Sequence, residues 1–194
     1  ELTCSGSGAC YELIVECPPS PHACSVRCTG SDHRTCYDID VRGATSASVA
    51  FECATSNYYC GRDAKLACPA SRAGGSCAVT CTAPGSRDST CRSLAVHAGP
   101  AGARVACAET ERGKSQSTCE NLELIPPTGT GEAAAAPLDL DCAACTGTSS
   151  NPCCASARTT ADQTVVACSS TTAYQVPNMA ACQCPEEAPA GGCK

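Results

Sequence analysis

The chain has 194 residues, 22 of them cysteine, with 13 Lys and Arg against 19 Asp and Glu, for a formal charge of −6. Cysteine at this level is typical of a disulfide scaffold, and such bridges are opened in reducing compartments, so the composition argues against a cytosolic enzyme. The acidic balance and the lack of a basic stripe argue against a nucleic-acid binder. With no Trp, one Phe and five Tyr, the chain needs cross-links to replace part of an ordinary aromatic core.

The cysteines are predicted to form disulfides rather than a metal site. Cys142 and Cys145 are the one C-x-x-C pair, without the second pair that a zinc site needs. The even count lets every thiol be bridged, and no cofactor or structural metal is expected. No apolar run near 20 residues is present, so no membrane span is expected. We therefore expect an extracellular or cell-surface protein, in its mature form after removal of a signal peptide.

A short phrase with an apolar residue two positions before a cysteine recurs about every 26 residues. Its anchors are Cys4, Cys28, Cys53, Cys81, Cys107, Cys142 and Cys168. A second cysteine follows each anchor after a polar segment, and then a second alternating phrase begins, as in residues 36–41, CYDIDV. The copy at residues 60–66 carries one extra residue. Alternation in such short runs, separated by turn residues, predicts two short strands in each repeat.

The parity of the apolar residues favours one way of arranging these strands. In a regular hairpin closed by Cys28 and Cys36, Val26 would share a face with Asp38, and Ile39 would lie on the other face. In a β-solenoid each strand pairs with its own copy in the next coil, and the apolar residues stack. The predicted fold is therefore all-β, a disulfide-stapled β-solenoid of about seven irregular coils of about 26 residues. Stacked antiparallel β-hairpins are the alternative.

The same register predicts most of the disulfide bonds. Pairing each anchor with the next cysteine gives Cys4–Cys10, Cys28–Cys36, Cys53–Cys60, Cys81–Cys91, Cys107–Cys119 and Cys168–Cys182. Three more pairs close return loops: Cys17–Cys24, Cys68–Cys77 and Cys184–Cys193. Cys142, Cys145, Cys153 and Cys154 are left to pair among themselves. Each loop of this size contributes about 2–3 kcal/mol in the chain-entropy account.

One continuous domain is expected, in three parts. Residues 1–124 form regular coils, residues 125–137 are a Pro/Gly/Ala-rich insertion, and residues 138–194 form degenerate coils with a cap at residues 182–193. The first strand has no comparable cap, and its open edge can take another strand.

The alternation of C-x-V-x-C-[ST]-G with a later C-x-x-[LI]-x-V is clearest at residues 24–30 and 77–81. It resembles the cysteine-rich tandem repeats of large extracellular proteins from algae, other protists and GC-rich bacteria. The resemblance is close over residues 1–124 and loose over residues 138–193. It implies a β-solenoid-like fold and a cell-surface or matrix role, and it supplies no catalytic residues.

Side chains for catalysis are sparse. His22, His33 and His97 lie in or beside expected loops and belong to no nucleophile motif. No serine-hydrolase elbow, zinc-protease helix, phosphate loop or dinucleotide motif occurs. The chain is therefore expected not to be an enzyme. A polysaccharide-acting β-helix enzyme is the least favoured alternative, because it needs convergent carboxylates that expected strand positions turn outward.

Two weak binding sites are candidates. Glu12, Asp38 and Asp40 offer hard oxygens that neighbouring coils would bring together around calcium, as the alternative to a solvated face. Tyr11 and Tyr37 occupy equivalent positions in successive coils and are expected to stack, with Tyr58 and Tyr59 in the next loop. These four tyrosines form either a structural ladder or an aromatic patch for a glycan or protein partner.

The leading functional hypothesis is a secreted or cell-surface structural protein. In this hypothesis the chain is a rigid rod that acts in adhesion, in an extracellular matrix or as a filament subunit. Its partners would be further copies of the chain, joined end to end, or other extracellular proteins or glycans. A binding module for a glycan or a protein is the second hypothesis. Repetition without catalytic chemistry is the observation behind this order.

Overall fold

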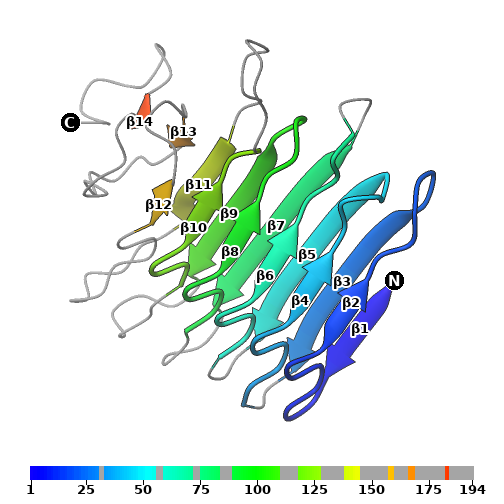
Figure 1. Ribbon diagram of the computed structural model, residues 1–194. Helices are drawn as coiled ribbons and strands as arrows, with labels where there is room; N and C mark the ends of the chain where they lie inside the picture. The colour runs from blue at the N-terminus through cyan, green and yellow to red at the C-terminus, as the bar shows by residue number, and fades with distance from the viewer. Residues whose placement is uncertain are drawn as a thin grey trace.

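Two parallel β-sheets run side by side along the molecule in a computed structural model (Figure 1). The structure describes residues 1–30, 33–55, 59–71, 75–83, 89–109, 118–127, 138–144, 157–159, 166–168 and 182–183. One sheet has eight strands in the order β1-β3-β5-β7-β9-β11-β13-β14, and the other has six in the order β12-β10-β8-β6-β4-β2. The chain visits the two sheets in turn, which makes a β-solenoid and confirms the predicted fold class.

The strands of the eight-stranded sheet are β1 (Leu2–Ser5), β3 (Ala23–Gly30), β5 (Ser48–Thr55), β7 (Ser76–Ala83), β9 (Ala103–Glu109), β11 (Leu138–Ala144), β13 (Val166–Cys168) and β14 (Cys182–Gln183). Those of the six-stranded sheet are β2 (Ile14–Glu16), β4 (Asp40–Arg42), β6 (Lys65–Ala67), β8 (Ala95–His97), β10 (Glu123–Ile125) and β12 (Arg158–Thr159). Every pairing between these strands is parallel. The alternative of stacked antiparallel hairpins is therefore wrong for the strands that the structure describes.

The core lies between the two sheets and consists of columns of like residues. In the eight-stranded sheet, the anchor cysteines of the first five coils are in register, and so are the apolar residues two positions before them. The latter column is Leu2, Val26, Phe51, Val79, Val105 and Leu140. Across the core, a buried column follows Ile39, Ala64, Leu94, Leu122 and Ala157, each just before a strand of the six-stranded sheet. Stacking of this kind buries each small layer against the next and needs few aromatic rings.

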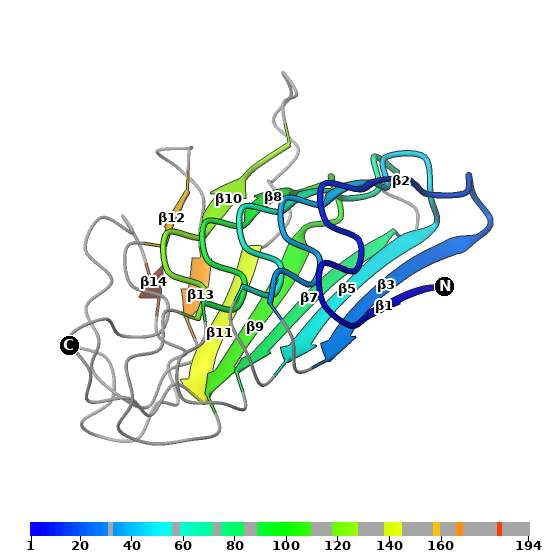
Figure 2. The same cartoon turned by 90° about the horizontal axis from the view of Figure 1, so that it is seen from below.

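The corner between the two sheets has the same backbone in every well-described coil (Figure 2). Cysteines at this corner have positive φ, and so do the residues two positions later. The pairs are Cys10 and Glu12, Cys36 and Asp38, Cys91 and Ser93, and Cys119 and Asn121. This left-handed conformation costs free energy for a residue with a side chain. Hydrogen bonds between coils hold it, as when Glu12 N donates to Tyr37 O at 2.9 Å.

The third coil explains the extra residue of the sequence repeat. Cys36 N donates to Ala9 O, and Cys91 N donates to Cys60 O, so Cys60 occupies the position before the corner. Gly61, with φ of 58°, takes the place that a cysteine holds in the other coils. A Cβ on Gly61 would lie 3.1 Å from Phe51 Cε1. The cysteine is therefore displaced by one residue where the chain's single phenylalanine fills the core.

Of the C-terminal cap expected at residues 182–193, the structure describes residues 182–183. Residues 182–183 form β14, which pairs in parallel with β13 and extends the eight-stranded sheet. A strand edge offers unpaired backbone groups, and β14 satisfies those of β13. The cap's other residues, 184–193, lie outside the described part of the chain, as do residues 128–137 of the expected insertion.

Candidate functional site

Seven of the predicted disulfides are present. They are Cys4–Cys10, Cys17–Cys24, Cys28–Cys36, Cys53–Cys60, Cys68–Cys77, Cys81–Cys91 and Cys107–Cys119. Cys142 is also disulfide-bonded, and no cysteine within the described residues is free. The predicted Cys168–Cys182 and Cys184–Cys193 bonds, and Cys145, Cys153 and Cys154, lie outside the side chains that the structure describes.

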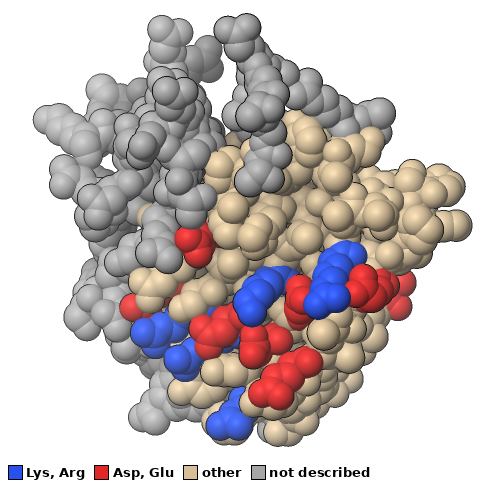
Figure 3. Space-filling model, viewed as in Figure 1, with Lys and Arg blue, Asp and Glu red and all other residues tan. Residues whose placement is uncertain are grey.

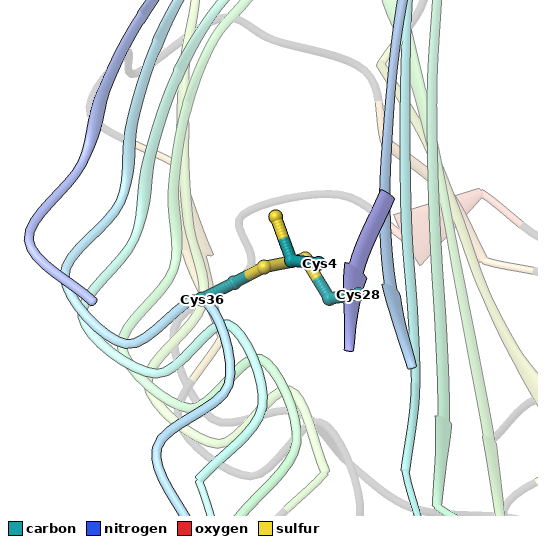
Figure 4. A group of neighbouring side chains, drawn as sticks. All are labelled: Cys4, Cys28 and Cys36. Carbon is teal, nitrogen blue, oxygen red and sulfur yellow. A yellow bond between two sulfur atoms is a disulfide. The ribbon is translucent and has the colours of Figure 1, made fainter. Parts of the chain in front are cut away.

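The disulfides of neighbouring coils form a stack inside the solenoid. The sulfurs of Cys4, Cys28 and Cys36 lie within 4.8 Å of one another (Figure 4), and those of Cys28, Cys53 and Cys60 form a second such group. Metal binding requires thiolates. All five of these sulfurs are already in disulfide bonds, so each group is part of a disulfide column rather than a metal centre.

The structure does not gather the carboxylates of the proposed calcium site. Groups of three or more metal-ligating side chains within 4.8 Å of one another, in the part of the chain that is described, consist of cysteines. Asp40 Oδ2 instead accepts a hydrogen bond of 2.9 Å from Arg42 Nε. Glu12, Asp38 and Asp40 are therefore not brought together into a cation site.

A row of aromatic side chains lies along the corner between the sheets. The rings of Tyr11 and Tyr37 are stacked with their centroids 5.6 Å apart, as expected from their equivalent positions. Tyr59 meets the edge of Tyr37 at 6.3 Å, with the rings nearly perpendicular. Each of Tyr11 and Tyr37 stands between two residues of positive φ, and this local backbone directs the middle residue away from the core. Tyr58 lies outside the described residues.

Arg62 extends this row into the third coil. It stands between Gly61 and Asp63, both of positive φ, and is therefore the counterpart of Tyr11 and Tyr37. Its Cζ lies 4.9 Å from the Tyr59 centroid and 5.9 Å from that of Tyr37, within the range of a cation–π interaction. Sequence reasoning missed Arg62, because the one-residue displacement of Cys60 hides its equivalence. We call Tyr11, Tyr37, Tyr59 and Arg62 the aromatic row.

Two carboxylates accept hydrogen bonds from the hydroxyls of Tyr11 and Tyr37. The Tyr11 hydroxyl donates a hydrogen bond to Glu12, which raises the pKa of Tyr11, with smaller contributions from desolvation and the Glu12 charge. The Tyr37 hydroxyl donates to Asp63, and this bond, followed by desolvation and the Asp63 charge, raises the pKa of Tyr37. Both phenols therefore stay protonated and act as hydrogen-bond donors at neutral pH.

Charged side chains on the surface pair across coils. Figure 3 shows Lys and Arg alternating with Asp and Glu in a band across one face. Arg42 Nη1 lies 2.8 Å from Glu16 Oε1, and on the eight-stranded sheet Arg27 Nε lies 3.2 Å from Glu52 Oε2. These pairs are exposed, so each stabilises the fold by less than about 1 kcal/mol.

His22, His33 and His97 are all exposed. Within the described residues, no helix is long and apolar enough to cross a membrane. Comparison with protein-family models, with curated proteins and with solved structures gave no match.

Proposed function

We propose that this chain is an extracellular structural protein, a rigid disulfide-stapled rod that serves in adhesion, in an extracellular matrix or as a filament subunit. The observation that carries the proposal is the local closure of the cross-links. Each of the seven disulfides joins cysteines only 6 to 12 residues apart. Each coil is thus fixed by its own bridges, and the coils are joined through a continuous parallel register.

Such a construction suits a load-bearing or surface role. The disulfides need an oxidising environment to persist, which fits secretion. The disulfides close the segments between the sheets at their cysteines, so the residues between two bonded cysteines can vary while the coil keeps its register. The proposal includes no catalytic step.

Immunogold electron microscopy of the cells that produce the chain tests this proposal. Antibodies raised against residues 1–109 are expected to label an extracellular layer or filament, and reduction of the disulfides is expected to disrupt that layer because it unfolds the coils. Antibodies depleted on the purified chain serve as the control. Label confined to the cell interior, or release of the chain by a simple salt wash, would contradict a structural role.

The aromatic row supports binding as a second candidate function. Tyr11 is 40% exposed, its hydroxyl is fixed by Glu12, and Arg62 gives the row a cationic end. Exposed tyrosines with fixed polar groups are common in glycan and protein recognition. Binding of the chain to a glycan array is expected to fall for Tyr11→Ala and Tyr37→Ala. It should be unchanged for Arg104→Ala, which alters an exposed arginine of β9 in the eight-stranded sheet; equal binding by all variants would remove the row as a site.

A further inference from the structure

The outer face of the eight-stranded sheet carries mostly short side chains over five neighbouring coils. Its strands β3, β5, β7, β9 and β11 lie side by side in chain order (Figure 1). Residues along each strand turn alternately toward the core and toward the outside. The outward residues are in register from coil to coil and form columns along the rod. One column is Ser25, Ala50, Ala78, Arg104 and Asp139, and the next is Arg27, Glu52, Thr80, Ala106 and Asp141.

This face is open to solvent and large enough for a protein partner. Ser76, Ala78 and Thr80 of β7 are exposed, as are Ala50 and Arg104 on either side. Short side chains let a second flat sheet approach closely. Five strands of this length cover about 600 Å², so two such faces would together bury about 1,200 Å², the lower end of the range for specific interfaces.

The charged residues of this face follow a fixed order along the rod. Arg27 in the second coil has its Nε 3.2 Å from Oε2 of Glu52 in the third. The outward residues of β7, in the fourth coil, are serine, alanine and threonine. Arg104 in the fifth coil lies 3.4 Å from Asp139 and 3.9 Å from Asp141 in the sixth. From the second coil to the sixth, the charges are therefore positive, negative, none, positive and negative.

This order is complementary to its own reverse. A two-fold axis parallel to the strands and above β7 places a second copy face to face, with its coils in the opposite order. Arg27 then lies opposite Asp141 of the second copy, in the same column. Glu52 lies opposite the coil of Arg104, displaced by two residues along the strand, which is within reach of an arginine side chain. Each charged coil therefore faces a coil of opposite charge.

Other partners do not match this order of charges. A two-fold axis along the rod would place each coil opposite its own copy, with Arg27 against Arg27 and Asp141 against Asp141, which is repulsive. A partner with a single sign of charge would attract either the arginines or the carboxylates of this face and repel the others. The order of charges therefore selects a second copy that runs in the opposite direction.

We propose that the outer face of β3, β5, β7, β9 and β11 binds the same face of a second copy, with the two rods antiparallel. Ala78 and Thr80 meet their own copies on the two-fold axis, where short side chains let the sheets pack closely. Arg27 and Asp141 pair between the copies at both ends of the interface. The inference goes beyond the proposed structural role, because it assigns a lateral contact between rods in addition to contacts at their ends.

Sedimentation equilibrium of the oxidised chain tests for this dimer. Dimers are expected to form as the concentration is raised to about 1 mM, because an interface at the lower end of the size range is weak. Ala78→Arg places two arginines against each other on the axis and is expected to lower the association constant at least about tenfold. A chain that stays monomeric at about 1 mM would overturn the proposal.

His97→Arg is the matched control for Ala78→Arg. It also adds an arginine to the fourth coil, but at an exposed position of β8 in the six-stranded sheet. The association constant should therefore stay unchanged. Disulfide mapping of both variants checks that they are folded. If dimers form and Ala78→Arg leaves them intact, another surface joins the copies and the proposed face is wrong.

Two charge reversals test the register between the copies. Arg27→Glu places a glutamate opposite Asp141 of the other copy, and Asp141→Arg places an arginine opposite Arg27, so neither variant should pair with itself. A mixture of the two variants should form a mixed dimer. In that dimer the two reversed residues face each other, and so do the two original ones. Sedimentation velocity with a fluorescent label on the Asp141→Arg chain measures the mixed dimer.

Lys65→Glu controls for a general effect of net charge. It changes the net charge as Arg27→Glu does, but at an exposed position of β6 in the six-stranded sheet. Mixed with Asp141→Arg, it should give fewer mixed dimers than Arg27→Glu, because one arginine pair stays repulsive. Equal yields with both partners, or no mixed dimer with Arg27→Glu, would overturn the antiparallel arrangement.

The lateral contact and the extracellular role fail separately. A chain that never forms dimers leaves the immunogold result for an extracellular layer untouched. Label confined to the cell interior would contradict the extracellular role and leave the dimer measurements on the purified chain untouched.

Discussion

Val49 fills the space that a side chain on Gly43 would need. A Cβ on Gly43 would collide with Val49 Cγ2 and lie 2.7 Å from the carbonyl oxygen of Ala67. Gly43 follows β4 as Cys17 follows β2, and Val49 is in register with Cys24. The second coil thus replaces a return-loop disulfide with a glycine and a buried valine.

Gly43→Ala is therefore expected to destabilise the chain by about 1–3 kcal/mol, the usual cost of overpacking a tight core. Urea denaturation of the oxidised chain measures the change. Gly6→Ala is a comparison for backbone strain without overpacking, because Gly6 has a φ of 99° and no atom lies within 4 Å of the position that its Cβ would take. If Gly43→Ala leaves the denaturation midpoint unchanged, Val49 does not fill this corner tightly.

The fourth coil is expected to accept a new disulfide. Ala98 follows β8 as Cys68 follows β6. Arg104 pairs with Ala78, so the residues before them, Ala103 and Cys77, hold equivalent positions. Gly99 and Gly102 form an antiparallel bridge between them. Ala98→Cys with Ala103→Cys should close a bond worth about 2 kcal/mol in the chain-entropy account.

Peptide mapping and thiol titration check for the new bond. The double variant should have no free thiol and should unfold at higher urea than its reduced and alkylated form, in which only this pair is open. Each single variant is expected to keep one free thiol. Scrambled pairing with Cys68 or Cys77 would contradict the register of these corners.

Three buried threonines each precede the corner cysteine of their coil, and their substitution by valine is expected to change the stability by different amounts. Thr35 Oγ1 donates to Gly6 O at 3.0 Å, whereas the buried hydroxyls of Thr90 and Thr118 have no hydrogen-bond partner within the described part of the chain. Thr35→Val should cost about 1 kcal/mol. Thr90→Val should be neutral or stabilising, because it removes an unpaired polar group. Equal losses in urea denaturation would contradict this difference.

Alkaline titration should separate Tyr37 from an ordinary tyrosine. The bond to Asp63 raises the pKa of Tyr37 above its usual 10.0, so its stabilising contribution is complete below pH 10 and is lost as pH rises through the folded-state pKa. Asp63→Asn is expected to lower that pKa, measured by phenolate absorbance after a rapid pH jump. Asp40→Asn, whose carboxylate pairs with Arg42, is the control, and an equal shift there would refute the assignment.

Much of the fold could be predicted from the sequence because the solenoid repeats one local pattern. The spacing of cysteines and apolar residues fixed the strands and the register that places Val26 beside Phe51. The seven disulfides followed from the same spacing. The corner of the third coil could not be predicted in this way. Its cysteine, Cys60, lies one residue before the usual corner position, and only the hydrogen bond from Cys91 N to Cys60 O shows this displacement.

Part of the candidate site could also be predicted from the repeat. Stacking of Tyr11 on Tyr37 follows from equal positions in equal coils. The place of Arg62 depends on the conformation of its two neighbours, which a pattern of residue types does not reveal. Asp40 is part of the calcium alternative to a solvated face because the sequence shows carboxylates on neighbouring strands, but the sequence does not show that Arg42 pairs with the Asp40 carboxylate.

Local closure of the disulfides also bears on how such a chain can change in length. Residues 4–27, 28–52, 53–80 and 81–106 each contain an even number of cysteines, and the bonds described within each segment close inside it. Duplicating or deleting one such segment would therefore orphan no thiol and leave the neighbouring bridges intact. Evolution can lengthen or shorten the molecule by whole coils without an intermediate that misfolds through an unpaired cysteine.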